Sequence, residues 1–437
     1  MKQKIQSAVF IAAYLFLVYH FIAKVCIPTF LPAQQDIVND FGSYYAASRL
    51  IADGQTPYRS LDNHSTIQLT NEELTKWQMN KQTLPAYIYP SFLAITLAPI
   101  TKLPFATARL LWSSFCTLCF FGCIALTFSL LKRKPKLDLT TLFIFFIYFA
   151  SMPTLESFTL GQVNYPVLLL LLLSFVCHDK KYSLLGGGAL AIAAVIKISP
   201  VLLLLYFLYR RDFRFIAGFL IVSSLAIILM LLSAPSIDTT FIREVLPAIS
   251  GKIPELNNKA LSVWWQFSFI NNELANPIVH SPRLASMLSA IFLIGIIVYI
   301  AFVFKRSDKL LQPNEQAKAT IQFLICCVGF LLVQPYMEIH HLIFAFPAVA
   351  YLIVFYTTDN TRWRNYGLLS LIFFLLNNRG ENSFRWLGAH WYSAFLSNPQ
   401  TYGLIIVLVL LSLILLQKIS PKPATTLAQM RLNLINR

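Results

Sequence analysis

The sequence predicts an all-α integral membrane protein with about 12 transmembrane helices, some of them short or broken. The chain has 437 residues, of which 57% are hydrophobic and only 12% are charged. A soluble domain carries about 25% charged residues, so this chain cannot cover a water-facing surface of its size. Its apolar residues form long runs separated by short basic clusters, which is typical of a multi-pass membrane protein.

A helix needs about 20 apolar residues to cross a bilayer. On that criterion we predict spans near residues 5–27, 105–131, 139–158, 163–178, 213–233, 284–304, 318–334, 342–357, 365–378 and 401–418. The stretch 184–209 is apolar but is interrupted by Lys197-Ile-Ser-Pro200. Because proline disfavours helix both at its own position and at the residue before it, we predict two half-helices that enter and return. The stretch 88–99 should be interfacial or re-entrant, or else it pairs with a further crossing that hydropathy does not reveal.

Short basic clusters set the predicted orientation, because cytoplasmic loops are enriched in Lys and Arg. The clusters are Lys132-Arg133-Lys134-Pro-Lys136, Lys180-Lys181, Arg210-Arg211-Asp-Phe-Arg214, Lys305-Arg306, Arg362-Trp-Arg364 and the tail from Lys418. All are cytoplasmic if the N-terminus is cytoplasmic and 184–209 turns back on itself. The first apolar run is too long for a signal peptide and lacks a small-residue cleavage site, so it predicts an uncleaved first span.

This topology leaves 28–104 as the first and longest extracytoplasmic loop, with short amphipathic helices. It also puts residues 159–163, 234–283, 335–341 and 379–400 and the break near Lys197 outside. We expect one integral-membrane domain over 1–437, in a bacterial inner membrane, with both termini cytoplasmic. We see no internal repeat, which does not favour a symmetric transporter.

Composition excludes several functions. The net charge of +16 lies in short clusters between apolar runs, so nucleic-acid binding is not indicated. All seven cysteines lie in or beside apolar segments and none has a metal-ligand spacing with histidine, so no metal or redox site is expected. There is no P-loop, dinucleotide-binding turn or nucleophile elbow, and we expect no cofactor.

The first candidate for chemistry is Asp40, in Asp40-Phe-Gly-Ser-Tyr44-Tyr45. A carboxylate at the outer mouth of a helix bundle could act as a general base on an acceptor hydroxyl. The alternative is that Asp40 or Ser43 caps the helix expected from Phe41 to Asp53, which Gly54 would end. Asp36, Asp53 and Asp62 are competing acids that are better explained as solvated loop charges.

The second candidate is Lys197, which stands between two isoleucines and away from the basic loops. A lysine in that setting costs several kcal/mol unless it is paired. At a break between half-helices it could neutralise a phosphate, assisted by backbone N–H groups that the break leaves free. The alternative is a lysine that extends to the membrane surface.

The third candidate is Gln334-Pro-Tyr-Met-Glu338-Ile-His340-His341, at the outer end of a span. Paired histidines can donate hydrogen bonds to a phosphate or sugar, or exchange protons near neutral pH. Glu338 and His341 have the spacing of a metal pair, but two ligands without a third are weak grounds for a metal. The alternative is a pair of histidines that simply face water at the membrane interface.

Weaker candidates are amides in outer turns. Gln162 and Asn164, in Gly161-Gln-Val-Asn, could hydrogen-bond sugar hydroxyls, although a simple tight turn explains them equally well. Two further outer-loop segments carry polar side chains that could contact a sugar in the same way, Asn257-Asn258-Lys259 and Asn377-Asn-Arg379.

Taken in order, these motifs resemble one family. The order is Asp40-Phe…Tyr45…Gly54…Pro57-Tyr58, Tyr89-Pro90, Leu103-Pro104…Trp112, Gly161-Gln-Val-Asn164, Gly187…Ala193-Ala-Val-Ile-Lys197-Ile-Ser-Pro200 and Pro335…His340-His341. It resembles glycosyltransferase family 87, polytopic membrane enzymes of the C-type glycosyltransferase superfamily, over roughly residues 36 to 350. The chain departs from the family pattern at Asn258-Lys-Ala-Leu-Ser262, and at Met337-Glu338 before the histidines.

The resemblance implies a C-type glycosyltransferase fold and a sugar donor carried on a polyprenyl phosphate. It also implies an acceptor reached from the outer face, inversion at the anomeric carbon and a catalytic acid in the first outer loop. Asp40 is at the position of that acid, Lys197 matches a lysine-x-x-proline position, and His340-His341 match paired histidines. The full predicted site comprises catalytic Asp40 and the substrate-binding residues Tyr44, Tyr45, Gln162, Asn164, Lys197, His340, His341 and Arg379.

We therefore predict an enzyme that moves a mannose- or pentose-like sugar to an envelope lipid or glycan. Its partners would be the lipid-linked donor, the acceptor and membrane lipids. The alternative is a lipid-linked-sugar flippase or small-solute transporter, which would carry charged residues deep on several helices. Here the predicted spans are nearly free of charge.

Overall fold

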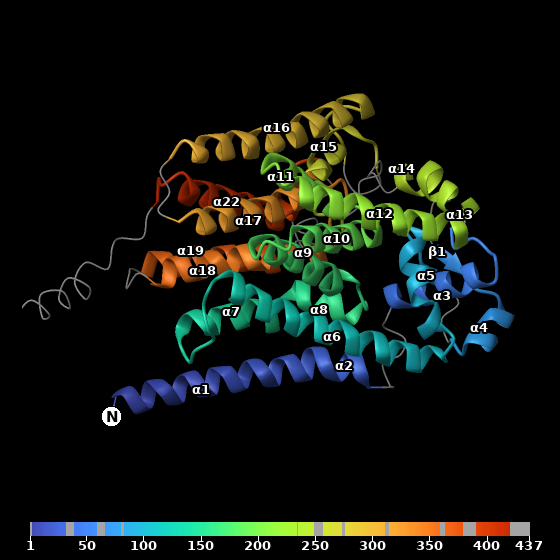
Figure 1. Cartoon of the computed structure of the whole chain (residues 1–437), viewed down its shortest axis with the longest axis horizontal. Coiled ribbons are helices and arrows are strands. Elements are labelled where there is room, and N and C mark those ends of the chain that lie inside the picture. The colour runs from blue at the N-terminus through green and yellow to red at the C-terminus, as the bar shows by residue number, and fades with distance from the viewer. Residues whose placement is uncertain are drawn as a thin grey trace, which may run out of the picture.

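The computed structural model is a bundle of helices with a small two-stranded sheet at one end (Figure 1). It describes residues 2–31, 39–58, 66–79, 83–233, 235–248, 257–272, 276–310, 314–358, 363–378 and 390–419. Arg379, Asp36 and Asp62 lie outside these ranges.

Seven helical stretches are long and apolar enough to cross a membrane. They are Ala8–Phe30, Phe105–Leu130, Leu139–Thr159, Phe213–Ser233, Pro282–Asp308, Glu315–Val333 and Ile339–Thr357. Shorter apolar helices are Ser91–Thr101, Asn164–Asp179, Ser183–Ile196, Ser199–Tyr209 and Pro399–Leu415. The prediction of an all-α membrane protein is confirmed, whereas the count of 12 crossings and the C-type fold remain predictions.

The first part of the chain forms one long helix and a group of short elements. These are α1 (Lys2–Phe21), the π-helix η1 (Ile22–Cys26), α2 (Ile27–Phe30), α3 (Asn39–Ala52), β1 (Thr66–Gln68), α4 (Asn71–Trp77), β2 (Thr83–Pro85) and α5 (Ser91–Thr101). Strands β1 and β2 pair antiparallel, with Ile67 opposite Leu84. Helix α3 is buried on nearly all sides, since Phe41 and Tyr45 are 0% exposed.

The middle of the chain carries the broken helices. Its elements are α6 (Phe105–Leu130), α7 (Leu139–Phe149), α8 (Met152–Thr159), α9 (Asn164–Asp179), α10 (Ser183–Ile196), the 3-10 helix η3 (Ser199–Leu203), α11 (Leu204–Tyr209), α12 (Phe213–Ser233), α13 (Pro235–Thr240), η4 (Phe241–Val245) and α14 (Leu246–Ala248). The predicted span 139–158 is interrupted between α7 and α8, because Ser151 accepts the backbone N–H of Thr154 and begins a new helix there.

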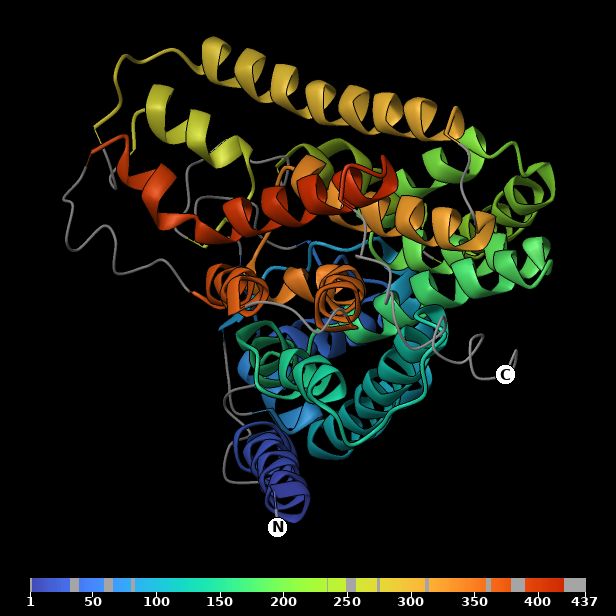
Figure 2. The same cartoon turned by 90° about the vertical axis from the view of Figure 1, so that its left-hand side faces the viewer.

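The last part of the chain supplies the centre and one edge of the bundle. Its elements are α15 (Ser262–Phe269), α16 (Pro282–Asp308), α17 (Glu315–Val333), the 3-10 helix η5 (Ile339–Ala345), α18 (Phe346–Thr358), α19 (Trp363–Asn377), α21 (Ser393–Ser397) and α22 (Pro399–Leu415). Helices α17 and α18 are mostly buried, whereas α1 and α16 lie at opposite edges with largely exposed apolar surfaces (Figure 2). Exposed apolar edges fit a lipid surround.

The predicted return of 184–209 is confirmed as a reversal of the chain. Helix α10 ends at Ile196, and Lys197 is extended at φ −140° and ψ 115°. The imidazole of His178 at the end of α9 lies 2.7 Å from the Asp212 carboxylate, just before α12. Because the chain enters α10 and leaves α11 at the same end of the bundle, Lys197 stands at the opposite end.

Glycines let α10 and α12 pack with their backbones in contact. A Cβ on Gly187 would lie 2.0 Å from the carbonyl oxygen of Phe215, and one on Gly218 would lie 2.1 Å from that of Leu184. Side-chain movement cannot relieve a clash with backbone. Small residues permit such close contact between membrane helices.

We therefore expect Gly187→Ala to lower the free energy of unfolding by about 1–3 kcal/mol, the range for overpacked sites. The measurement is the thermal midpoint of the purified protein in detergent. Gly295→Ala is the matched control, because nothing lies within 4 Å of its added Cβ, and it should be neutral or slightly stabilising. Equal midpoints for the two variants would contradict the close approach of α10 and α12.

Several helices end in the same hydrogen-bonded turn, in which the residue after the cap is left-handed. Near α3 and α8 that residue is glycine, Gly54 at φ +71° and Gly161 at φ +67°. At the ends of α6, α9 and α11 it is Lys132, Lys181 and Arg211, at φ 50°, 68° and 54°. The left-handed conformation costs a residue with a Cβ roughly 1–2 kcal/mol, so these three cations are strained where glycine would not be.

Candidate functional site

Asp40 lies in the first turn of α3, facing the α8–α9 turn. The backbone N–H groups of Asp40 and Phe41 donate to the carbonyl of Leu160, at 3.1 and 3.2 Å. The Asp40 carboxylate accepts a hydrogen bond of 2.5 Å from Nε2 of Gln162. The described part of α3 begins at Asn39, and Ser43 donates to the carbonyl of Pro85. Asp40 and Ser43 therefore lie inside the helix and not at the position of its N-cap.

Gln162 connects Asp40 to two buried tyrosines. Its Oε1 accepts hydrogen bonds from the hydroxyls of Tyr44, at 3.0 Å, and Tyr89, at 3.2 Å. Burial raises the pKa of Tyr44 and of Tyr89 well above the usual value, and the negative charge of Asp40 adds to both shifts. Both phenols therefore stay protonated as donors, and the Asp40 carboxylate is the proton acceptor that this group of four residues offers.

Lys197 and Asn164 form a second chain of hydrogen bonds. The Lys197 ammonium donates to Oδ1 of Asn164 at 2.9 Å, and Asn164 Nδ2 donates to the carbonyl of His340 at 3.2 Å. The ammonium also lies 5.9 Å from the centre of the Phe344 ring. The break after α10 therefore places a partly buried lysine beside the Asn164 amide and the Phe344 ring.

The paired histidines differ in their hydrogen bonding. The backbone N–H of Glu338 donates to Nδ1 of His341 at 3.0 Å, so the His341 proton must be on Nε2. His340 Nδ1 instead lies 3.3 Å from a carboxylate oxygen of Glu338, although the two are not aligned for a hydrogen bond. The Glu338 carboxylate also accepts from the Tyr336 hydroxyl at 2.7 Å. His341 is thus an Nε2 donor, and His340 is paired with an acid.

This assignment predicts opposite results for two substitutions of His341. Asparagine can place an oxygen near the position of Nδ1, and glutamine can place an N–H near that of Nε2. We expect His341→Asn to keep its thermal midpoint but to lose at least about tenfold of the sugar transfer that the resemblance noted in the sequence implies. His341→Gln should keep more activity but lose about 1 kcal/mol of stability with its capping bond. Thermal melts and transfer rates measure both, and the reverse ranking would contradict the assignment.

The sequence alone does not assign a role in this site to three of its residues, Glu338, Asn258 and Tyr89. Glu338 stood out only as half of a weak metal pair, and Asn258 only as a loop amide. In the structure Asn258 accepts the N–H of Met337 at 3.0 Å and donates to Pro335, which fixes the segment that leads into the histidines. Tyr89 was part of a motif alone. These contacts join residues that are far apart in the sequence, so only the folded structure reveals them.

Other predicted residues do not join the cluster. The Tyr45 hydroxyl donates to the carbonyl of Leu103 at 2.8 Å and accepts from Arg49, so it holds α3 to the chain before α6. Asp53 is exposed and pairs with Lys76 at 3.1 Å. Among the described residues, no group of three or more His, Cys, Asp or Glu side chains is arranged to hold a metal ion.

Comparison with family models decides the class of protein. The model of glycosyltransferase family 87 matches residues 87–335, which is more than half of the chain. The chain belongs to glycosyltransferase family 87. Comparison with curated protein sequences and with solved structures gave no significant match.

Membership of glycosyltransferase family 87 supports an enzyme, with a sugar donor and an acceptor, over the flippase or transporter alternative. The matched range contains two residues of each hydrogen-bonded chain. These are Tyr89 and Gln162 of the first chain and Asn164 and Lys197 of the second. Asp40 and the two histidines lie outside it. For those three residues, the contacts described above are the structural support for a shared site.

Proposed function

We propose that this family 87 glycosyltransferase moves a mannose- or pentose-like sugar from a polyprenyl-phosphate donor to an envelope lipid or glycan, with inversion. The observation that carries the proposal is the meeting of Asp40 and Lys197. Gln162 holds Asp40 and Asn164 holds Lys197, which is partly buried, so two charged side chains from distant segments bond residues only two positions apart at the α8–α9 turn. Two costly charges in one place favour a functional site.

In this mechanism Asp40 is the general base. It removes the proton from the acceptor hydroxyl as that oxygen attacks the anomeric carbon of the sugar. The bond from that carbon to the phosphate oxygen breaks, and both electrons leave with the polyprenyl phosphate. Because attack and departure occur on opposite faces of one carbon, a single displacement inverts the configuration. The proton remains on Asp40 until solvent removes it.

The leaving phosphate gains negative charge as the bond breaks, because a diester with one charge becomes a monoester with two. Lys197 and the Nε2–H of His341 are the groups proposed to stabilise that charge. Gln162 and the protonated Tyr44 and Tyr89 orient the Asp40 carboxylate. Tyr45 and Arg379 remain proposed substrate contacts. Tyr45 bonds Leu103 and Arg49 outside this cluster, and Arg379 lies outside the described residues.

A lipid-linked donor fits the architecture. Apart from one small sheet, the described chain is helical, so no described part resembles a parallel-sheet domain for a nucleotide sugar. A polyprenyl tail would instead lie in the bilayer beside the helices. The test is reconstitution in liposomes with polyprenyl-phosphate mannose, polyprenyl-phosphate arabinose or the corresponding nucleotide sugars. We expect transfer from a lipid-linked donor alone, and transfer from a nucleotide sugar alone would refute the proposal.

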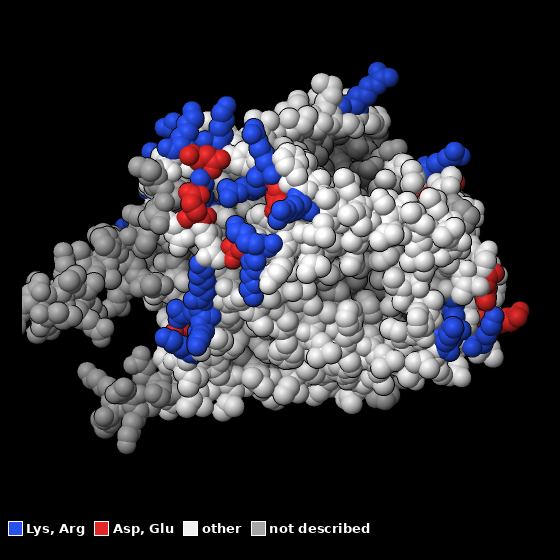
Figure 3. Space-filling view, viewed as in Figure 1, with Lys and Arg blue, Asp and Glu red and all other residues white. Residues whose placement is uncertain are grey.

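The proposed site is extracytoplasmic, on the face away from the basic loops. Lys and Arg side chains gather at the end of the bundle where α6, α9 and α11 end (Figure 3). The elements of 39–101 lie at the other end (Figure 1). By the positive-inside rule, the basic end would face the cytoplasm of a bacterial inner membrane, with both termini.

This sidedness predicts a labelling pattern. In a background without the seven native cysteines, Ala52→Cys should react with an impermeant maleimide added outside intact spheroplasts, and Lys134→Cys should react only after lysis. Both native side chains are exposed, so neither labelling depends on unfolding. The opposite pattern would overturn the topology and the proposed donor route with it.

A further inference from the structure

Three exposed cations occupy strained positions at one end of the bundle. Lys132, Lys181 and Arg211 each follow a helix cap in the left-handed conformation, where glycine is the usual choice. The same turn elsewhere in the chain uses Gly54 and Gly161 and, after α22, the uncharged Gln417 at φ 57°. The chain thus places a charged side chain at these three positions where a glycine would be unstrained. Strain of this kind is commonly retained where it serves a function.

The three positions lie at the same end of the bundle. Lys132 and Asp179 both hydrogen-bond Gln316 near the start of α17, which joins the ends of α6 and α9. Tyr209 hydrogen-bonds Asp308, and Lys318 pairs with Asp308 at 2.7 Å, which joins the end of α11 to the same group. Figure 3 shows Lys and Arg gathered over this end.

Each strained cation is soon followed by an exposed apolar side chain. Leu137 is 65% exposed after the cluster at Lys132, Tyr182 is 61% exposed after Lys181, and Phe213 is 74% exposed after Arg211. Binding of nucleic acid or of a soluble protein does not require an exposed apolar side chain after each cation. Alternating cations and exposed apolar groups match the boundary between lipid headgroups and acyl chains.

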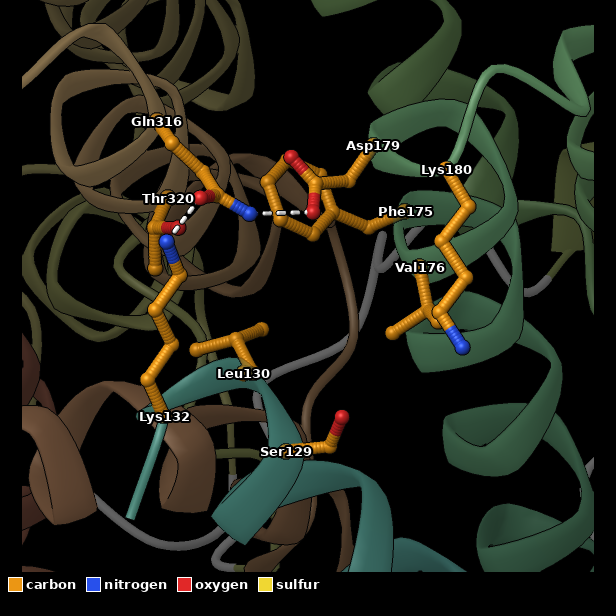
Figure 4. A pocket seen from close by; sticks show the side chains of 9 residues that line it. All are labelled: Ser129, Leu130, Lys132, Phe175, Val176, Asp179, Lys180, Gln316 and Thr320. Carbon is orange, nitrogen blue, oxygen red and sulfur yellow. Dashed lines mark hydrogen bonds between the residues drawn. The ribbon is translucent and has the colours of Figure 1, made fainter.

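One strained lysine also borders a small pocket between α6, α9 and α17 (Figure 4). The pocket is lined by the ammonium-bearing side chains of Lys132 and Lys180 and by the hydroxyl-bearing side chains of Ser129 and Thr320. Asp179 also lines it, with its carboxylate engaged by Gln316. The Lys132 ammonium is bonded to Gln316 on one side of the pocket and the Lys180 ammonium lies on the other side (Figure 4), so each offers a donor for phosphate oxygens at a different edge of the pocket.

We propose that this end of the protein binds anionic phospholipid headgroups through Lys132, Lys181 and Arg211, with one headgroup phosphate seated in the pocket beside Lys132 and Lys180. This binding is separate from the sugar-transfer site at the other end. Basic pockets between membrane helices are known to take phosphate-bearing headgroups.

The experiment compares thermal midpoints of the full-length protein in detergent, with and without added lipid. The probes are short-chain phosphatidylglycerol, phosphatidylcholine and inorganic phosphate. For the wild type we expect phosphatidylglycerol to raise the midpoint by several degrees and phosphatidylcholine to leave it unchanged. Inorganic phosphate should raise it far less, because it cannot use the apolar flanks.

Two triple variants separate strain from charge. Replacing Lys132, Lys181 and Arg211 with glycine should raise the midpoint without lipid and reduce the phosphatidylglycerol shift at least twofold. Replacing the same three with glutamine keeps the strained side chains, so the midpoint without lipid should stay near wild type while the shift falls at least twofold, as in the glycine variant. The double variant of Lys132 and Lys180 to glutamine should remove about half of the shift.

Matched controls make the proposal falsifiable. Lys134, Lys305 and Lys309 are exposed cations near the same end that are not left-handed, and their triple change to glutamine should preserve most of the shift. Gln78→Gly removes a left-handed side chain elsewhere and should raise the midpoint without changing the lipid response. An equal loss in the control triple, an equal response to phosphatidylcholine or inorganic phosphate, or no gain from the glycine triple would overturn the proposal.

Discussion

Replacing Asp40 with asparagine is expected to lower kcat for sugar transfer about 10²- to 10⁴-fold, the usual contribution of general-base catalysis, and to leave the fold intact. Asparagine keeps an oxygen that can accept the 2.5 Å bond from Gln162. The N–H groups at the start of α3 bond the carbonyl of Leu160, so they do not depend on this carboxylate. The variant therefore removes the base and little else. Initial rates with reconstituted protein and a labelled polyprenyl-phosphate sugar measure the loss.

Two further variants serve as controls for Asp40→Asn. Asp53 follows the other end of α3 and is exposed and paired with Lys76, so Asp53→Asn should transfer sugar at the wild-type rate. Asp40→Glu should retain part of the activity, because the carboxylate is kept but displaced. A thermal midpoint for Asp40→Asn close to wild type is required. Wild-type transfer by a well-folded Asp40→Asn variant would remove Asp40 from the mechanism.

Features of the fold that depend on neighbouring residues in the chain could be predicted from the sequence. Pro200 and the isolated charge of Lys197 predicted the reversal of 184–209, and α10 does end at Ile196. Gly54 was expected to end the helix from Phe41, and it is left-handed there. Both predictions depend on residues within a few positions of one another, which is the range over which backbone preferences act.

The predicted span 139–158 agrees with the membrane-spanning stretch Leu139–Thr159, but its interruption between α7 and α8 could not be predicted. Residues 139–158 have the apolar composition of a single span, but Ser151 begins a new helix, after which Gly161 turns the chain toward α9. Hydropathy averages over about 19 residues, so it does not register one capping serine. That break helps to bring Leu160 and Gln162 to the start of α3.

The site itself depends on contacts between distant segments. Asp40, Gln162 and Tyr89 meet across more than 70 residues of sequence, and Glu338 gains its setting from Lys197 and the adjacent histidines. No spacing rule links such positions. The sequence could identify polar residues one at a time, but it could not show that the backbone N–H of Glu338 bonds His341 while its carboxylate lies near His340.

The second large effect is expected for Lys197→Gln, which keeps a polar side chain but removes the charge. We expect kcat to fall about 10²- to 10³-fold, as for the loss of one donor to a developing anion. The loss should appear mainly in kcat and less in KM for the donor. The reason is that the bound donor carries one negative charge on its phosphate, whereas the departing phosphate approaches two.

The alternative for Lys197, a side chain that merely extends to the membrane surface, predicts a different outcome. It would leave kcat and KM unchanged, and a purely ground-state contact with the donor would raise KM alone. Lys102→Gln is the control, since Lys102 is exposed and near the start of α6. Lys197→Arg should recover part of the rate, because the charge returns on a bulkier group. Only a loss concentrated in kcat, with partial recovery by arginine, fits a lysine that stabilises the leaving phosphate.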